Sequence, residues 1–145
     1  NHTEATWIMS AVLAVGQTFR VTRAVTEEVY RAFVICSGDC NPLHADDAYA
    51  QGLGYSSKLM HGAILNAFIS GFVGTALPTS DTMCLSQKLN FKRPFFLNDV
   101  VELCATVDSV QGAPQPGKWI VSFAAMFRVN NRMIATGKVE ALIGM

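Results

Sequence analysis

The segment from Ser37 to His44 contains a carboxylate and an imidazole five residues apart, Asp39 and His44. Two such groups in one short loop can reach a single water molecule, and they offer a base and an acid with different pKa values. The same spacing also fits an ordinary structural role, in which Asp39 caps a turn and His44 lies on the surface. Because short motifs in single sequences often arise by chance, spacing alone favours the structural interpretation.

Two cysteines beside this pair raise the possibility of a metal or a nucleophilic thiol. Cys36, Cys40 and His44 recur at steps of four, and zinc is often bound by such residues. However, Gly38 and Pro42 interrupt any single helix through them, so the three side chains need not share a face. An adjacent carboxylate also disfavours the thiolate of Cys40. We therefore expect no metal and no other cofactor, and we interpret these thiols as core or pocket-lining groups.

A long uncharged segment predicts the helix that positions this loop. Residues 61–77 carry no charge after His61, and Pro78 stops the pattern. An uncharged helix in a soluble chain must be covered by the rest of the fold, and this one is too short and too interrupted for a membrane span. We expect His61 to be a structural residue that opens the helix, and Asn66 to be a hydrogen-bonded polar group in the core.

The chain before this helix shows the signals of one strand and two further helices. A strand is predicted over 14–23. Thr26 is a predicted N-cap, and the helix that it starts should end near Ser37–Gly38. Asp46 can cap a short helix after the loop. The catalytic candidates thus lie between two helices.

After residue 78 the pattern changes from helical to alternating, and four strands are predicted. The first, over 83–91, places these residues on one face: Met83, Leu85, Gln87, Leu89 and Phe91. The last two strands meet at a hairpin turn, Asn130–Asn131. Consecutive strands imply an antiparallel sheet. We expect an α+β hot-dog fold: a long central helix wrapped by a curved antiparallel β-sheet, in one domain over residues 14–145 after a frayed extension over 1–13.

Composition excludes several classes of protein. The chain has 145 residues, of which 50% are apolar, and 11 basic residues balance 11 acidic ones. Net neutrality argues against nucleic-acid binding and weakens a membrane-surface role, while an apolar, neutral chain tends to associate. The four cysteines form no CxxC pair, and no secretory signal pattern opens the chain, so we expect reduced thiols and a cytoplasmic location.

The decapeptide over 37–46, SGDCNPLHAD, resembles the signature of the MaoC-like (R)-specific enoyl-CoA hydratases, the hydratase-2 family. Three further segments match in order and spacing: Met60–Gly62, Ile69–Gly71 and Phe91–Pro94. The resemblance covers the domain from about Val15 onward. Members of this family adopt the hot-dog fold, usually as dimers. They add water to trans-2-enoyl thioesters to give (R)-3-hydroxyacyl thioesters, or run the reverse.

The resemblance implies a role for each matched residue. Asp39 and His44 correspond to the catalytic pair. In the syn addition that we expect, Asp39 draws a proton from water and His44, or a water relay that it orients, delivers one to the α-carbon; the resemblance leaves open which of the two is the base and which the acid. Gly62 corresponds to the glycine whose backbone N–H binds the thioester carbonyl. Ser70 corresponds to a serine that supports the active-site loop by hydrogen bonding. Asn41 is counted with the substrate-binding residues and is expected to fix the loop.

Two alternatives remain within the same fold. A hot-dog acyl-CoA thioesterase would hydrolyse the substrate, but such enzymes generally lack the histidine. A non-catalytic acyl-thioester-binding dehydratase subunit would have lost the pair, whereas this chain has Asp39 and His44. We expect a hydro-lyase of fatty acid metabolism that acts as a homodimer, joined edge to edge, on an acyl-CoA or acyl-carrier-protein thioester. Three cations are either a solvated sheet edge or contacts for coenzyme A phosphates: Lys88, Lys92 and Arg93.

Overall fold

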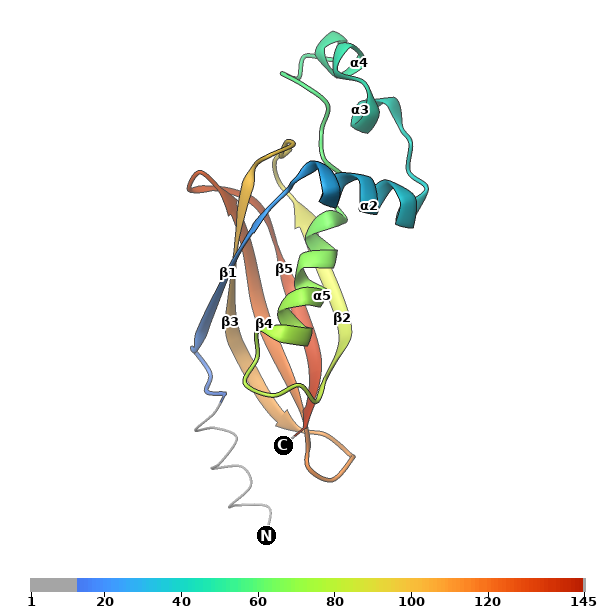
Figure 1. The fold of residues 1–145 in the computed structure, drawn as a ribbon. Coiled ribbons are helices and arrows are strands. Elements are labelled where there is room, and N and C mark those ends of the chain that lie inside the picture. The colour runs from blue at the N-terminus through green and yellow to red at the C-terminus, as the bar shows by residue number, and fades with distance from the viewer. Residues whose placement is uncertain (1–12, 145) are drawn as a thin grey trace.

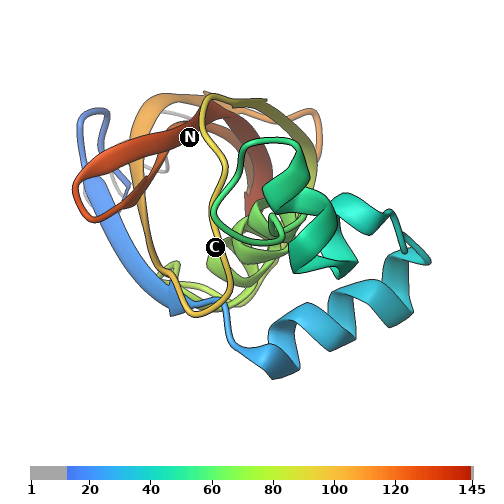
Figure 2. The same ribbon diagram turned by 90° about the horizontal axis from the view of Figure 1, so that it is seen from above.

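A computed structural model describes residues 13–144, which form one sheet and four helices. In chain order the elements are β1 (Thr18–Ala24), α2 (Glu27–Ser37), α3 (Pro42–Ala45), α4 (Asp47–Gly52), α5 (Ile64–Thr75), β2 (Thr82–Phe91), β3 (Val100–Gly112), β4 (Lys118–Val129) and β5 (Arg132–Gly144). The strand order is β1-β3-β4-β5-β2, and every neighbouring pair is antiparallel. The sheet curves around α5, while α2, α3 and α4 lie over one end (Figures 1 and 2). The predicted α+β hot-dog architecture is confirmed.

Helix α5 packs one face against the sheet. The residues of this face are all buried: Ile64, Leu65, Phe68, Ile69, Phe72 and Val73. The opposite face presents Ala67, Ser70 and Gly74, which are exposed. The prediction of an almost wholly buried helix over 61–77 is therefore wrong in extent and in burial. The helix begins at Ile64, and one curved sheet covers one side of it only.

Strand β2 contains a bulge that sequence alternation did not predict. Its pairing with β5 shifts between Cys84 and Ser86, so Cys84, Gln87 and Leu89 are half-buried while the residues between them turn outward. Two apolar side chains before the bulge, Met83 and Leu85, are consequently exposed. Phe91, on the same face as Gln87 and Leu89, is exposed at the end of the strand. The side chain of Asn66 donates a hydrogen bond to the Gln87 side chain at 2.9 Å, which confirms it as a bonded polar group between helix and sheet.

Local signals in the sequence are confirmed at several element ends. Thr26 caps α2 through its hydroxyl, and Gly38 ends that helix in the left-handed region at φ 71°. Asp46 caps α4, as predicted. The hairpin residues Asn130 and Asn131 have φ of 48° and 64°, the positive values that such a turn needs.

The start of the domain differs from the prediction. Residues 14–17 form a turn in which the Gln17 N–H donates to the Ala14 carbonyl at 2.9 Å, so β1 begins only at Thr18. Leu13, placed in the frayed extension, is fully buried in the core. The remainder of that extension, residues 1–12, lies outside the described residues. Over residues 13–144 no helix combines the length and apolar character needed to cross a bilayer.

Candidate active site

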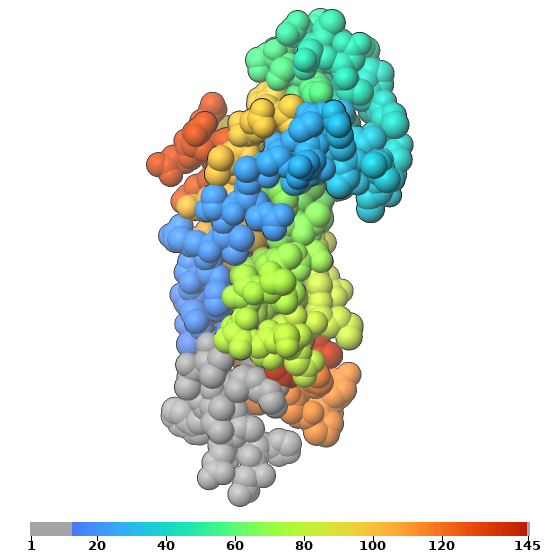
Figure 3. Space-filling model, in the orientation of Figure 1, coloured from blue at the N-terminus to red at the C-terminus, as the bar shows by residue number. Residues whose placement is uncertain are grey.

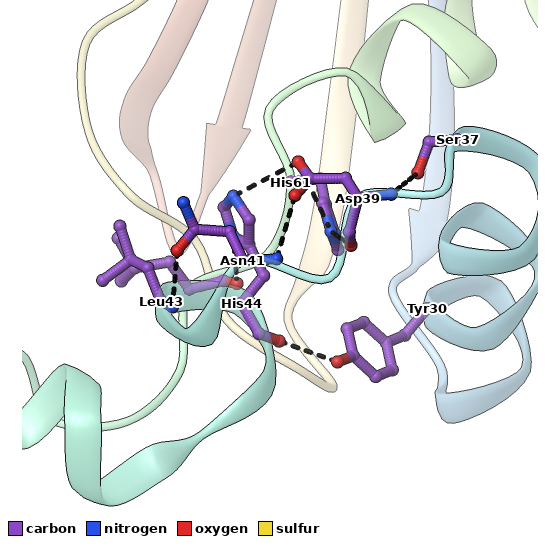
Figure 4. Close-up of polar contacts among 8 residues, drawn as sticks. Tyr30, Ser37, Asp39, Asn41, Leu43, His44 and His61 are labelled. Carbon is purple, nitrogen blue, oxygen red and sulfur yellow. Dashed lines mark hydrogen bonds and ion pairs between the residues drawn. The ribbon is translucent and has the colours of Figure 1, made fainter.

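Helices α3 and α4 project beyond the end of the sheet (Figures 1 and 3). The loop between α2 and α3 carries Asp39. Its backbone is fixed by its own side chains (Figure 4). Asp39 N–H donates to Ser37 Oγ at 3.1 Å, and Asn41 N–H donates to Asp39 Oδ1 at 3.1 Å. The Asn41 side-chain oxygen accepts from Leu43 N–H at 2.9 Å and so caps α3. Asn41 thus holds the loop, whereas its contact with substrate stays a prediction.

The short helix α3 carries His44 back toward Asp39. His44 Nδ1 lies 2.9 Å from the Leu59 carbonyl oxygen. A carbonyl can only accept, so Nδ1 bears the proton and the neutral ring has its lone pair on Nε2. The Tyr30 hydroxyl donates to the His44 carbonyl at 2.7 Å, which anchors α3 to α2. These bonds fix both the orientation and the tautomer of the imidazole.

His44 Nε2 lies 3.9 Å from Asp39 Oδ2. That separation is too long for a direct hydrogen bond, but one water molecule can contact both atoms. The Asp39 side chain is 45% exposed and that of His44 19%, so water can reach the pair. The structure brings the two residues together as the loop hypothesis requires. Their catalytic roles stay a prediction.

His61 lies beside the same pair, a proximity that the sequence analysis missed. Its Nε2 is 3.1 Å from the Asp39 carbonyl oxygen, and its ring stacks on His44 with centroids 4.1 Å apart. The residue is 2% exposed, and the Phe33 ring packs on it at 4.8 Å. Burial lowers the pKa of His61 below its usual 6.5 and outweighs the bond to Asp39. Its place directly before Gly62, within the matched motif, was the available signal.

Asp39, His44 and His61 each offer one ligand atom, and these atoms lie within 4.8 Å of one another. Both cysteines of the zinc hypothesis, Cys36 and Cys40, are exposed and stand outside this group. His61 Nε2 donates its hydrogen to the Asp39 carbonyl, so it offers no lone pair to an ion. As arranged, the three residues do not fit a metal. A metal-independent reaction stays a prediction, which full activity after exhaustive chelation would support.

The turn that leads into α5 presents free backbone donors. Within residues 13–144 the N–H groups of Gly62 and Ala63 donate no hydrogen bond. A Cβ on Gly62 would lie 3.1 Å from the Phe91 ring, so glycine allows that ring to approach closely. Gly62 and Phe91 line a cleft of about 330 Å³ whose wall also includes Leu59. Asp39 and His44 do not line this cleft. Leu59 links the cleft to the pair, because it lines the cleft and its carbonyl accepts the hydrogen bond from His44 Nδ1.

The remaining candidates fall into two groups. Lys92 and Arg93 line the cleft beside Gly62, whereas Lys88 is exposed on β2 outside it. Ser70 is exposed on the outer face of α5, and its side chain makes no hydrogen bond with any residue of the described range. In a single chain, therefore, Ser70 is not bonded to the loop that carries Asp39.

The fold is that of the hot-dog proteins, and its site is an aspartate–histidine pair near the start of the central helix. Residues 11–122 match the MaoC like domain, and the chain belongs to this family. It is 28% identical to an (R)-specific enoyl-CoA hydratase of Rhodospirillum rubrum over 88% of this chain and 86% of that protein. It is also 28% identical to a mitochondrial 3-hydroxyacyl-[acyl-carrier-protein] dehydratase of Arabidopsis thaliana, over 91% of this chain and 78% of the relative. An R-hydratase structure from Pseudomonas aeruginosa superposes with a TM-score of 0.80 at 30% identity, covering 92% of this chain and 84% of that one.

Proposed function

We propose that this protein interconverts trans-2-enoyl thioesters and (R)-3-hydroxyacyl thioesters by syn addition and removal of water. The observation that carries the proposal is the 3.9 Å distance between His44 Nε2 and Asp39 Oδ2, two polar atoms that one water molecule can contact together. The names of the relatives, hydratases and dehydratases of such thioesters, support the same reaction. The enzyme is accordingly a hydro-lyase.

In the hydration direction, Asp39 begins as a carboxylate and His44 as an imidazolium. Asp39 takes a proton from the shared water as the oxygen bonds to the β-carbon. The α-carbon receives a proton from His44 Nε2 on the same face, which gives syn addition. Because Nδ1 is held by the Leu59 carbonyl, Nε2 can donate only when the ring is protonated. Proton transfer from Asp39 to His44 through the next water then restores both groups.

The developing negative charge on the thioester oxygen needs a donor. Gly62 N–H is free within the described chain and stands at the start of α5, where the helix dipole also favours negative charge. We assign it to the thioester carbonyl. The Phe91 ring beside Gly62 would cover one side of a carbonyl held in the cleft.

The substrate is an acyl thioester whose carrier bears phosphate, either coenzyme A or acyl carrier protein. Both carriers present a phosphate-bearing pantetheine arm. Lys92 and Arg93 line the cleft beside Gly62 and supply positive charge there. The Arg93 guanidinium also donates to the Met133 carbonyl at 2.8 Å, which leaves Lys92 as the more mobile phosphate contact.

Crotonyl-CoA tests the reaction directly. We expect loss of the enoyl absorbance and formation of (R)-3-hydroxybutyryl-CoA, identified by chiral chromatography. Release of free thiol instead would mean hydrolysis and would identify a thioesterase. Unchanged substrate, also with longer enoyl chains and with acyl-carrier-protein thioesters, would indicate a non-catalytic subunit and overturn the proposal.

We also propose that the protein is a cytoplasmic homodimer joined through the edge strand β2. This edge exposes Met83 and Leu85, and an unpaired apolar edge is a liability unless another strand covers it. The four free cysteines suit a reducing compartment. Sedimentation equilibrium at micromolar concentration should give twice the chain mass, and Leu85→Lys should shift it toward the monomer. A wild-type monomer would contradict the dimer.

A further inference from the structure

His61 is a buried titratable residue for which the proposed reaction has no use. It does not line the cleft, and it is 2% exposed, yet it contacts both halves of the pair and its Nε2 lies 3.9 Å from Asp39 Oδ2. A histidine buried among apolar rings is costly unless its polar atoms are satisfied. One of them is not: His61 Nδ1 is buried and has no partner in the described chain.

The contacts of the ring define its tautomer. The Asp39 carbonyl oxygen, 3.1 Å from Nε2, can only accept, so Nε2 bears the hydrogen. Nδ1 is then a bare lone pair, and protonating it would place a buried hydrogen there without an acceptor. Among the groups that face the ring, the Asp39 carbonyl and the Asp39 carboxylate, 3.9 Å from Nε2, favour a positive charge, whereas burial beside the Phe33 ring and the neighbouring His44 oppose it. Burial is the largest of these effects, so the pKa of His61 lies below its usual value. His61 is therefore held as the neutral Nε2–H imidazole.

We infer that His61 is a positioning residue, whose neutral ring holds Asp39 and His44 at their working separation. The inference rests on the proposed hydration reaction. Its Nε2–H bond fixes the backbone of Asp39, and its face supports the His44 ring at 4.1 Å with an interplanar angle of 28°. One rigid side chain thus contacts both groups that must flank the same water (Figure 4).

The position of His61 in the chain also links the Asp39–His44 pair to the N–H of Gly62. It directly precedes Gly62, and its own carbonyl accepts the first hydrogen bond of the helix, from Ile64 N–H at 3.1 Å. A shift of the imidazole would therefore move the pair relative to the carbonyl-binding N–H. Misplacement of reacting groups by about 1 Å can cost roughly 10²-fold in rate.

Two substitutions of similar size separate positioning from simple packing. His61→Gln can place an amide N–H where Nε2 lies, whereas His61→Asn places its amide nearer Nδ1 and loses the bond to the Asp39 carbonyl. We expect His61→Asn to lower kcat by about 10²-fold and His61→Gln to retain most of it, with KM changed little in either, because His61 does not touch substrate. Equal kcat values for the two variants, or a wild-type kcat for His61→Asn, would overturn the inference.

A measurement on the wild-type protein removes any dependence on variant folding. The chain has three histidines, and long-range ¹H–¹⁵N spectra distinguish their tautomers. We expect the His61 signals, assigned through His61→Gln, to report an Nε2–H ring that is neutral at the pH of full activity. A protonated or Nδ1–H ring at the pH of full activity would contradict the inference. Hydration of crotonyl-CoA by the wild-type protein tests the proposed reaction separately. A wrong role for His61 can therefore be told apart from a wrong reaction.

Discussion

His44 and His61 stack at 4.1 Å although 17 positions separate them in the sequence, and only one of the two rings is open to water. The His44 side chain is 19% exposed and the His61 side chain 3%. Two adjacent imidazolium ions would repel each other, and burial decides which ring stays neutral. His44 is thus free to exchange protons, while His61 serves as a fixed support.

Asp39→Asn should lower kcat by about 10²–10⁴-fold, because it keeps the shape of the side chain and removes the basic oxygen. The loop should stay folded, since the amide oxygen can still accept from Asn41 N–H. Steady-state hydration of crotonyl-CoA measures the effect. Asp46→Asn is the matched control: the same change at an N-cap, where asparagine also caps well, should leave kcat unchanged. A near wild-type rate for Asp39→Asn would show that Asp39 is not the base.

Substitution of His44 separates its chemistry from its anchoring. His44→Asn can keep a donor near Nδ1 for the Leu59 carbonyl, whereas His44→Gln places its amide nearer Nε2. Neither amide can carry a proton to the α-carbon, so kcat should fall by about 10²–10⁴-fold in both. We expect the thermal melting temperature to fall less in His44→Asn. High activity in either variant would remove His44 from the proton transfer.

Gly62→Ala tests the carbonyl-binding turn. The new Cβ would lie 3.1 Å from the Phe91 ring, so the ring must shift by a few tenths of an ångström beside the N–H that we assign to the thioester oxygen. We expect kcat/KM to fall by less than about 10²-fold, since that is the cost of misplacing reacting groups by about 1 Å. Adding Phe91→Leu should recover part of the loss because the crowding is relieved. Wild-type kcat/KM in Gly62→Ala alone would count against this assignment.

Lys92→Gln should weaken substrate binding without slowing the chemical step. The contribution of one exposed cation is modest, so KM for enoyl-CoA should rise roughly two- to fivefold while kcat is retained. Lys88→Gln, the same change outside the cleft, is the control. A short N-acetylcysteamine thioester, which has no phosphate, should show the same KM in wild type and Lys92→Gln. A KM effect on both substrates would mean that Lys92 does not act through phosphate.

Stability should fall as the pH drops through 6.5, partly because of His61. Burial holds the pKa of this ring below 6.5 in the folded protein, so in that window the unfolded chain binds a proton that the native state does not. The free energy of unfolding therefore decreases with falling pH until the lowered pKa is reached. Urea melts between about pH 7.5 and 5 should show a flatter dependence for His61→Phe than for wild type. Parallel curves would contradict neutral burial of His61.

Much of the site is determined by local sequence. Several features depend only on residues close together in the sequence, and the structure places them as predicted. They are the proximity of Asp39 and His44, the end of α2 at Gly38, and the N-caps Thr26 and Asp46. Caps and turns depend on bonds between near neighbours, so one segment carries enough information to specify them. Local sequence also predicts the strands that follow α5 from their alternation of apolar and polar residues, except at the bulge in β2.

Tertiary structure decided what depends on distant partners. The bulge in β2 follows from its pairing with β5, which alternation in a single strand does not encode. Burial of α5 on one face only, with Ser70 outward, depends on how far one sheet can curve around it. The role of His61 depends on a contact with Asp39 across 22 residues, made only when the loop folds over the start of α5. Local patterns specify which groups are available, and long-range packing decides which of them meet.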